Sequence, residues 1–93
     1  MEIVVNAADA ALANIESRDE IEDVLEEALS SSALGEVTGG GGGQGTYIID
    51  VELDEERFDE ALDFLISVLR SLRLPPSTRA KRHEPTEVAY TLD

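Results

Sequence analysis

Two stretches of the chain carry apolar residues at helical spacing and predict amphipathic helices. The first begins at Ser17, which is placed to form a capping box with Glu20, and ends near Gly35. Its apolar stripe consists of Ile21, Val24, Leu25, Ala28 and Leu29. The second begins at the capping residue Asp54 and is closed by Pro75-Pro76. Its apolar stripe consists of Phe58, Ala61, Leu62, Leu65, Ile66, Leu69 and Leu72.

Four segments have the composition or the alternation of strands: residues 1–7, 35–38, 47–53 and 86–92. In residues 47–53 one face is apolar, and the other carries Ile48, Asp50 and Glu52. In residues 86–92 the side chains expected to point inward are Val88, Tyr90 and Leu92. Residues 9–16 show no clear period and are expected to form a loop or a frayed turn. Residues 77–84 have no apolar face and are expected to form a loop or an exposed edge strand.

The resulting order of elements is β-α-β-β-α-β, within a single α+β domain spanning residues 1–93. Helices with one apolar stripe and strands with one apolar face bury their apolar surfaces against each other. The sequence therefore predicts a ferredoxin-like split βαβ sandwich, with two helices on one face of a mainly antiparallel four-stranded sheet. The other face of that sheet is expected to be open to solvent.

A run of glycines between the second and third predicted strands raises the question of phosphate binding. A phosphate-binding loop needs a Lys after its last glycine and a helix next, whereas Gly45 is followed by a strand. The run therefore predicts the tip of a β-hairpin, and so many glycines favour a flexible loop. The glycines of this expected loop are Gly39, Gly40, Gly41, Gly42, Gly43 and Gly45.

The charge of the chain is strongly negative and unevenly distributed. The net charge is −14; residues 1–63 carry 18 acids and two bases, and residues 64–93 carry three acids and five bases. Such a field repels nucleic acids and anionic membranes and attracts basic proteins. Solubility or adaptation to high salt accounts for the same composition equally well. No apolar stretch is long enough for a membrane helix, so a cytoplasmic protein is expected.

Candidate chemistry is sparse. The chain has no cysteine, and its one histidine, His83, lacks a nucleophile pattern and is expected in a surface loop. Carboxylates are so abundant that no pair stands out as an acid and a base. Asp50, Glu52 and Asp54 resemble the start of an oxygen-ligand metal site, but the EF-hand spacing is absent. We therefore expect no catalytic residue, no metal and no cofactor.

The segments "LGEVTGGGGG", "YIIDVEL" and "ALDFLISVLRSLRLP", which lie between Leu34 and Pro75, resemble small bacterial α+β proteins. That pattern is associated with immunity proteins of toxin systems and with uncharacterised relatives. The resemblance covers about forty residues, and its motif is structural. It implies a protein that neutralises a toxin domain, often a basic nuclease, by covering the active site, and it implies no catalytic residues.

The function expected from these observations is non-enzymatic binding of a basic protein, such as a toxin domain. The expected contact residues are Glu36, Asp50 and Glu52, on the wet strand face beside the glycines. The alternative is a small regulatory or ligand-sensing module that dimerises through its open sheet face, where Ile48 is exposed. A small-molecule enzyme using carboxylates has no specific cue. The chain is thus expected to be a monomer or a homodimer that binds neither nucleic acid nor membrane.

Overall fold

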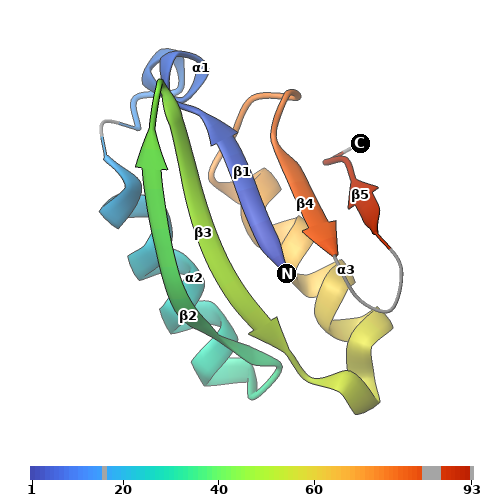
Figure 1. Ribbon diagram of the computed structural model, residues 1–93. Helices are drawn as coiled ribbons and strands as arrows, with labels where there is room; N and C mark the ends of the chain where they lie inside the picture. Colours follow the sequence, from blue (N-terminus) through green and yellow to red (C-terminus); the bar gives the residue numbers. More distant parts are fainter. Residues whose placement is uncertain (16, 83–86, 93) are drawn as a thin grey trace.

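An antiparallel sheet with helices packed on one of its faces forms the body of the molecule (Figure 1). The computed structural model describes residues 1–15, 17–82 and 87–92. Within them the sheet has five strands in the order β2-β3-β1-β4-β5, and every neighbouring pair is antiparallel. In chain order the elements are β1 (Glu2–Asn6), α1 (Ala7–Leu12), α2 (Arg18–Ser32), β2 (Gly35–Gly43), β3 (Thr46–Leu53), a 3₁₀ turn (Glu55–Arg57), α3 (Phe58–Ser71), β4 (Arg79–Arg82) and β5 (Val88–Tyr90).

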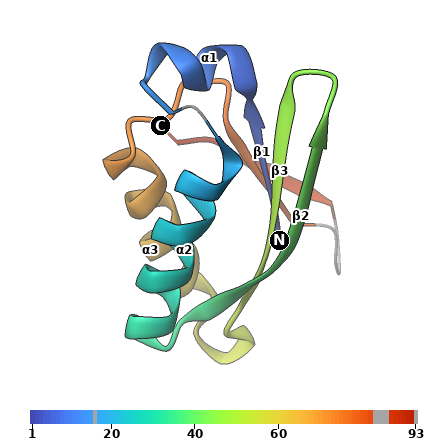
Figure 2. The same cartoon turned by 90° about the vertical axis from the view of Figure 1, so that its left-hand side faces the viewer.

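Helices α2 and α3 lie side by side on one face of the sheet, and the opposite face is uncovered (Figure 2). The core between these layers is aliphatic, as the composition predicts. Its fully buried large side chains are Ile3, Val5, Ile21, Leu25, Leu29, Ile49, Leu65 and Leu69. The prediction of an α+β domain with a mainly antiparallel sheet is confirmed.

Helix α2 starts where the sequence places it, but its two ends differ from the prediction. Ser17 is the N-cap residue, yet its side chain makes no capping hydrogen bond. At the other end Ala33, rather than Gly35, takes the left-handed conformation, with φ 57°. Gly35 begins β2 instead, where a Cβ would overlap the Glu52 carbonyl oxygen. This glycine therefore allows close strand pairing rather than a helix stop. Val24, predicted in the stripe, is 38% exposed.

The prediction of four strands is wrong, because residues 79–82 form an interior strand. Strand β4 pairs with β1 on one side and with β5 on the other. Its sequence, RAKR, gives no apolar signal, since Ala80 alone is buried in the core. The predicted last strand exists as β5 but takes the edge position, which leaves Val88 38% exposed while Leu92 is buried.

A short helix, α1 (Ala7–Leu12), also forms where the sequence predicts the end of the first strand and then, from residue 9, a loop or a frayed turn. Helix α1 follows β1 directly, and the Asn6 side chain caps it by accepting a hydrogen bond from the Asp9 backbone N–H at 3.0 Å. Ala10 is its buried residue. With six residues and one buried side chain, α1 lacks the apolar period by which helices are recognised in sequence.

The glycine run forms a β-hairpin, as predicted, but Gly39–Gly43 lie in a strand and not in the connecting loop where the sequence places them. These five glycines belong to β2 and pair with β3 from Asp50 back to Thr46. The connection between the strands is Gln44-Gly45 alone, with φ of 53° and 79°. Two consecutive residues with positive φ make the tight turn that matches the twist of a hairpin. Of the glycines expected in the loop, only Gly45 lies in the turn.

Candidate functional site

The three carboxylates predicted to bind a partner lie together on the uncovered face of the β2–β3 hairpin. Glu36 of β2 is the direct cross-strand partner of Glu52 of β3. Asp50 lies two residues from Glu52 along β3, so its side chain points to the same face. All three residues are exposed. We call Glu36, Asp50 and Glu52 the acidic triad.

The acidic triad has no counter-charge in the part of the chain that the structure describes. No ion pair or hydrogen bond there engages the side chains of Glu36, Asp50 or Glu52, and the ion pairs of that part lie elsewhere. Like charges directly opposite each other across an antiparallel pair are destabilising. The Glu36–Glu52 pair therefore opposes folding of the hairpin, and a cation placed between the two carboxylates would relieve it.

A shallow depression of about 270 Å³ lies at this end of the hairpin. It is lined by Ala33, Gly35, Glu36, Glu52, Leu53 and Asp54. The depression is open and acidic, so it suits a protruding basic side chain better than an enclosed small molecule. No group of three or more acidic, His or Cys side chains able to hold a metal ion occurs within residues 1–15, 17–82 and 87–92.

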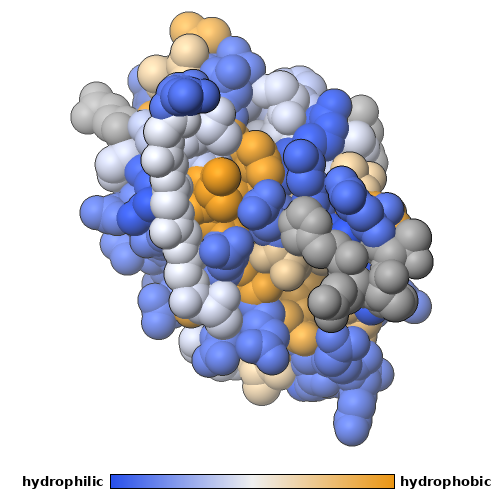
Figure 3. Space-filling model, in the orientation of Figure 1, coloured by the Kyte–Doolittle hydropathy of each residue, from blue (hydrophilic) through white to orange (hydrophobic). Residues whose placement is uncertain are grey.

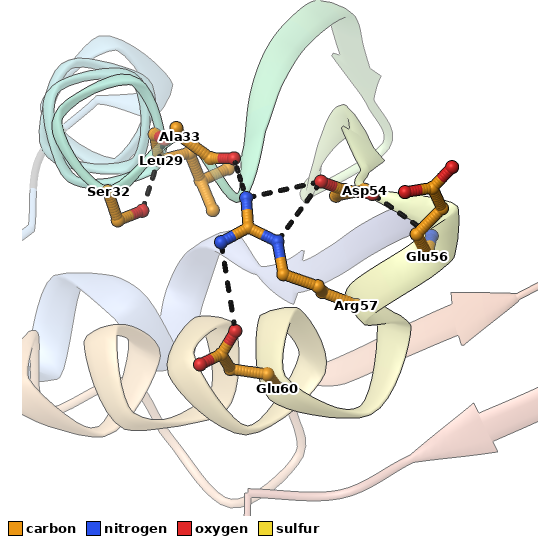
Figure 4. Close-up of polar contacts among 7 residues, drawn as sticks. All are labelled: Leu29, Ser32, Ala33, Asp54, Glu56, Arg57 and Glu60. Atoms are coloured by element: carbon orange, nitrogen blue, oxygen red, sulfur yellow. Dashed lines mark hydrogen bonds and ion pairs between the residues drawn. The ribbon is translucent and has the colours of Figure 1, made fainter.

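Arg57 joins two residues that line this depression, Ala33 and Asp54 (Figure 4). The Arg57 guanidinium donates hydrogen bonds to the Ala33 carbonyl at 2.7 Å and to Asp54 Oδ2 at 3.2 Å. It also lies 3.9 Å from the Glu60 carboxylate. Arg57 thus ties the end of α2 to the start of α3. The charge of Arg57 is engaged by Asp54 and Glu60, next to the depression that Glu36 and Glu52 also line.

Asp54 takes part in the same contacts. It accepts a hydrogen bond from the Glu56 backbone N–H at 3.0 Å and caps the 3₁₀ turn, as the sequence predicts for a helix start. This N–H, and then the Arg57 side chain, hold the pKa of the Asp54 carboxyl below its ordinary value. Asp54 is therefore a structural cap, and the metal-site resemblance of Asp50, Glu52 and Asp54 has no counterpart in the described structure.

Two more acidic residues lie beside the hairpin, one on each face of the sheet, and neither is predicted from sequence. Glu2 of β1 pairs with Asp50 on one side and with Lys81 of β4 on the other, so it continues the acidic row. Burial alternates along β1 and places Glu2 outward, and the register brings it beside Asp50. Glu22 of α2 is paired with Arg18 at 3.0 Å and packs against the bare backbone of Gly40 on the helix-covered face, where a Cβ would come within 2.7 Å of its Oε1. No sequence signal links Glu22 to that strand.

The uncovered sheet face also carries an apolar patch. Val4 and Ile48 are cross-strand partners on β1 and β3, and both are half-buried. Figure 3 shows apolar surface at this place, next to a near-white strip where the glycines of β2 expose their backbone. The outward position of Ile48 predicted from sequence is confirmed. Val4 enlarges this patch.

A second hollow, of about 710 Å³, lies between the end of α1 and the loop that follows α3. It is lined by Asp9, Leu12, Ala13, Asn14, Arg73, Pro75, Pro76 and Ser77. Leu12 is 86% exposed there, and the Ser77 hydroxyl donates a hydrogen bond to Asp9 at 2.8 Å. Asn14 and Arg73 both have positive φ. This hollow could not be predicted from sequence, because its walls come from two turns far apart in the chain.

Comparison of the chain with protein-family models, with curated proteins and with solved structures finds no match. The resemblance to immunity proteins therefore stays a prediction. His83, which the sequence places in a surface loop, lies outside the described residues. None of the helices in the described part of the chain has the length and apolarity needed to cross a membrane.

Proposed function

We propose that this protein is a non-enzymatic binding protein whose acidic triad docks a basic protein. The observation that carries the proposal is the Glu36–Glu52 pair, in which two carboxylates face each other with no cation from the described chain between them. A basic side chain of a partner would turn this repulsion into two attractive contacts. Lys or Arg from a partner is the chemistry that the depression at the hairpin end accepts.

The setting of the triad supports the same proposal. A net charge of −14 raises the rate of encounter with a basic protein at low ionic strength. A rigid sheet presents the carboxylates, so little conformational entropy is lost on docking. We further propose that strands β2-β3-β1-β4 with α2 and α3 form a ferredoxin-like core to which β5 is appended. The cytoplasmic location and the role of an immunity factor for a toxin belong to this proposal as well.

Affinity capture with matched charge variants tests the proposal. The test variant is Glu36→Gln/Asp50→Asn/Glu52→Gln, and the control is Asp23→Asn/Glu26→Gln/Glu27→Gln on the exposed side of α2. Both raise the net charge by the same amount, so only the place of the change differs. We expect the wild type and the control to capture the same basic protein from the native host, and the test variant to lose it. Equal capture by both variants would show that the acidic triad is not the binding site, and an equal loss in both would implicate overall charge instead.

The ionic strength of the capture separates specific docking from weak adhesion. Surface charges interact over about 10 Å at 0.1 M salt and about 3 Å at 1 M salt, so association should slow as salt is raised. If no basic protein is recovered even at low salt, the proposal is wrong. If the captured protein is toxic when expressed alone, co-expression of the wild type, and not of the test variant, should restore growth. That result would identify an immunity factor.

The alternative function is a regulatory or ligand-sensing module that dimerises through the uncovered sheet face. The Val4–Ile48 patch favours it, because two such patches can pack face to face, and the hollow of about 710 Å³ is large enough for a small ligand. Sedimentation at high protein concentration tests the dimer, with Ile48→Lys as the variant that abolishes it. A monomer at every concentration would remove this alternative.

A further inference from the structure

Strand β2 forms one edge of the sheet, and its outer side pairs with no other described strand. Natural proteins usually protect such an edge with charged side chains, proline, bulges or short strands. Here β2 has nine residues, and a bulge between Val37 and Gly39 interrupts its N-terminal half. Beyond the bulge, Gly39–Gly43 offers backbone without side chains. An edge of this kind is open to a further strand.

The direction of the backbone groups along this edge follows from the register. Val51 N–H donates to the Met1 carbonyl at 2.8 Å and therefore faces β1. Backbone groups alternate sides along a strand, so Thr46, Ile48 and Asp50 direct theirs toward β2. Their partners are Gly43, Gly41 and Gly39. The N–H and C=O groups of Gly40 and Gly42 must then point outward, to the free edge.

Steric needs within the molecule account for only some of these glycines. A Cβ on Gly40 or Gly42 would come within 3.0 Å of a backbone oxygen of β3, at 2.7 Å and 2.9 Å respectively. On Gly41 it would meet nothing within 4 Å, and on Gly39 only the Asp50 carboxylate at 3.9 Å. Neither Gly39 nor Gly41 has positive φ. A glycine that its own fold does not require suits the close approach of another chain.

We propose that an extended segment of the basic partner adds to the free edge of β2 as a sixth strand. Its backbone pairs with the outward N–H and C=O groups of Gly40 and Gly42. Side chains on the helical side of the added strand meet Glu22, which lies against Gly40 and is already paired with Arg18 at 3.0 Å, so its charge is engaged. Side chains on the other side cross the bare backbone of β2 toward Asp50, the partner of Gly39. On that face the acidic triad has no ion pair within the described residues, so it calls for a segment rich in Lys or Arg.

Charge decides between such a partner and a second copy of this chain. Pairing β2 with β2 of another molecule would bring together two chains of net charge −14, each with Glu36 and Asp50 on the uncovered face beside the edge. Repulsion across that junction would oppose the dimer. A basic segment meets the same carboxylates with attraction. This proposal rests on the proposed function and adds the mode of docking to it.

Amide hydrogen exchange of the isotopically labelled protein tests the proposal. The probe is a synthetic nonapeptide in which lysine alternates with threonine. In the free protein the amides of Gly40 and Gly42 should exchange quickly, and those of Gly39, Gly41 and Gly43 slowly. The peptide should slow exchange at Gly40 and Gly42 by up to about 100-fold at a concentration of about 100 times its Kd. Peptides N-methylated at every second residue, in either phase, provide the control, because only the phase that removes the pairing donors should abolish the protection.

The other outcomes overturn the proposal in ways that can be told apart. If the peptide binds and perturbs the acidic triad while Gly40 and Gly42 still exchange quickly, strand addition is wrong but the proposed function stands. If both N-methylated peptides protect as well as the parent, backbone pairing is absent. If protection at Gly40 and Gly42 grows with protein concentration and without peptide, the occupant is a second copy. If no lysine peptide binds at low salt, strand addition by a basic segment is wrong, and capture from the host tests the proposed function independently.

Discussion

The two halves of the sheet, with β4 on one side and the β2–β3 hairpin on the other, differ in whether their charged side chains are engaged by the fold. On the β4 side, Arg79 donates hydrogen bonds to the carbonyls of Pro76 and Thr78, at 2.6 Å and 3.0 Å. Arg82 stacks 3.9 Å from the Phe58 ring centroid and lies 4.0 Å from Glu55. On the β2–β3 side, the acidic triad has no such contact within the described residues. The fold engages these bases and leaves these acids without an ion pair in the described residues, and this contrast is why we propose the β2–β3 side as the partner-binding side.

The two sides also differ in how they are stabilised. The hairpin pairs over its whole length, from Gly35 opposite Leu53 to Gly43 opposite Thr46, whereas β4 and β5 share three pairs. The hairpin contributes Ile49, Val51 and Leu53 to the core, and β4 contributes Ala80. The side that carries the proposed site is therefore the more firmly anchored one. Four predictions test this contrast.

The largest effect is expected from the core under the hairpin. Ile49 is fully buried, so Ile49→Ala should lower the free energy of unfolding by about 2–5 kcal/mol. Val88→Ala on β5 should change it by less than about 0.5 kcal/mol, because Val88 is partly exposed at the edge. Denaturant unfolding of both variants measures the difference. Equal losses would mean that the two sides are anchored alike.

A comparison of two glycines of β2 should give the next largest effect. A Cβ on Gly35 overlaps the Glu52 carbonyl oxygen, so Gly35→Ala should cost about 1–3 kcal/mol. A Cβ on Gly41 meets nothing within 4 Å, so Gly41→Ala should be neutral or stabilise the protein by up to about 1 kcal/mol. Thermal and denaturant unfolding provide the test. A destabilised Gly41→Ala variant would show that the strand needs glycine there for its own fold.

Removing one charge of the acidic triad should have a smaller effect on stability, and it should raise the free energy of unfolding rather than lower it. Glu36→Gln ends the repulsion with Glu52, so it should stabilise the free protein by roughly 0.2–1 kcal/mol at low salt. The gain should shrink as salt screens the charges. Glu27→Gln, on the exposed side of α2, is the control. A loss of stability in Glu36→Gln at low salt would mean that Glu36 has a favourable partner in the folded protein.

The smallest effect concerns Asp54 and appears only in acid. The pKa of the Asp54 carboxyl is lowered in the folded protein, so this group stabilises the fold above its unfolded pKa. That contribution is lost as the pH falls below about 4 and through the lower folded value. Unfolding measured against pH should therefore be less steep in Asp54→Asn than in the wild type over that range. The same slope in both proteins would show that Asp54 makes no linked contribution.

The sequence predicts this molecule well where side chains carry the signal. The stripe of α3 and the alternation of β3 locate both elements, because apolar side chains recur at the period of the structure they form. The exposed position of the acidic triad follows from the same alternation. Which residue of β2 pairs with Glu52 depends on where the hairpin turn lies. A run of five glycines does not show where the turn begins, so the Glu36–Glu52 pair cannot be predicted from sequence.

The prediction fails where main-chain contacts decide the structure. Strand β4 has Ala80 as its buried residue in the core, and β2 beyond Thr38 has no side chains at all. Both strands form because β1 and β3 present a ready hydrogen-bonding edge. Helix α1 depends on a cap from Asn6. Such elements give no periodic pattern, so the sequence alone leaves them as loops, a frayed turn or an exposed edge strand.

The bulge beside Thr38 gives the glycine run a tolerance to changes in its length. Between Val37 and Gly39 the strand β2 advances two residues while β3 advances one, from Val51 to Asp50. The run is thus one residue longer than a regular ladder requires. Loss of one glycine would straighten the strand and still leave Glu36 opposite Glu52 and Gly43 opposite Thr46. Replication slippage in this repetitive stretch could therefore shorten the protein by one residue without displacing its acidic end.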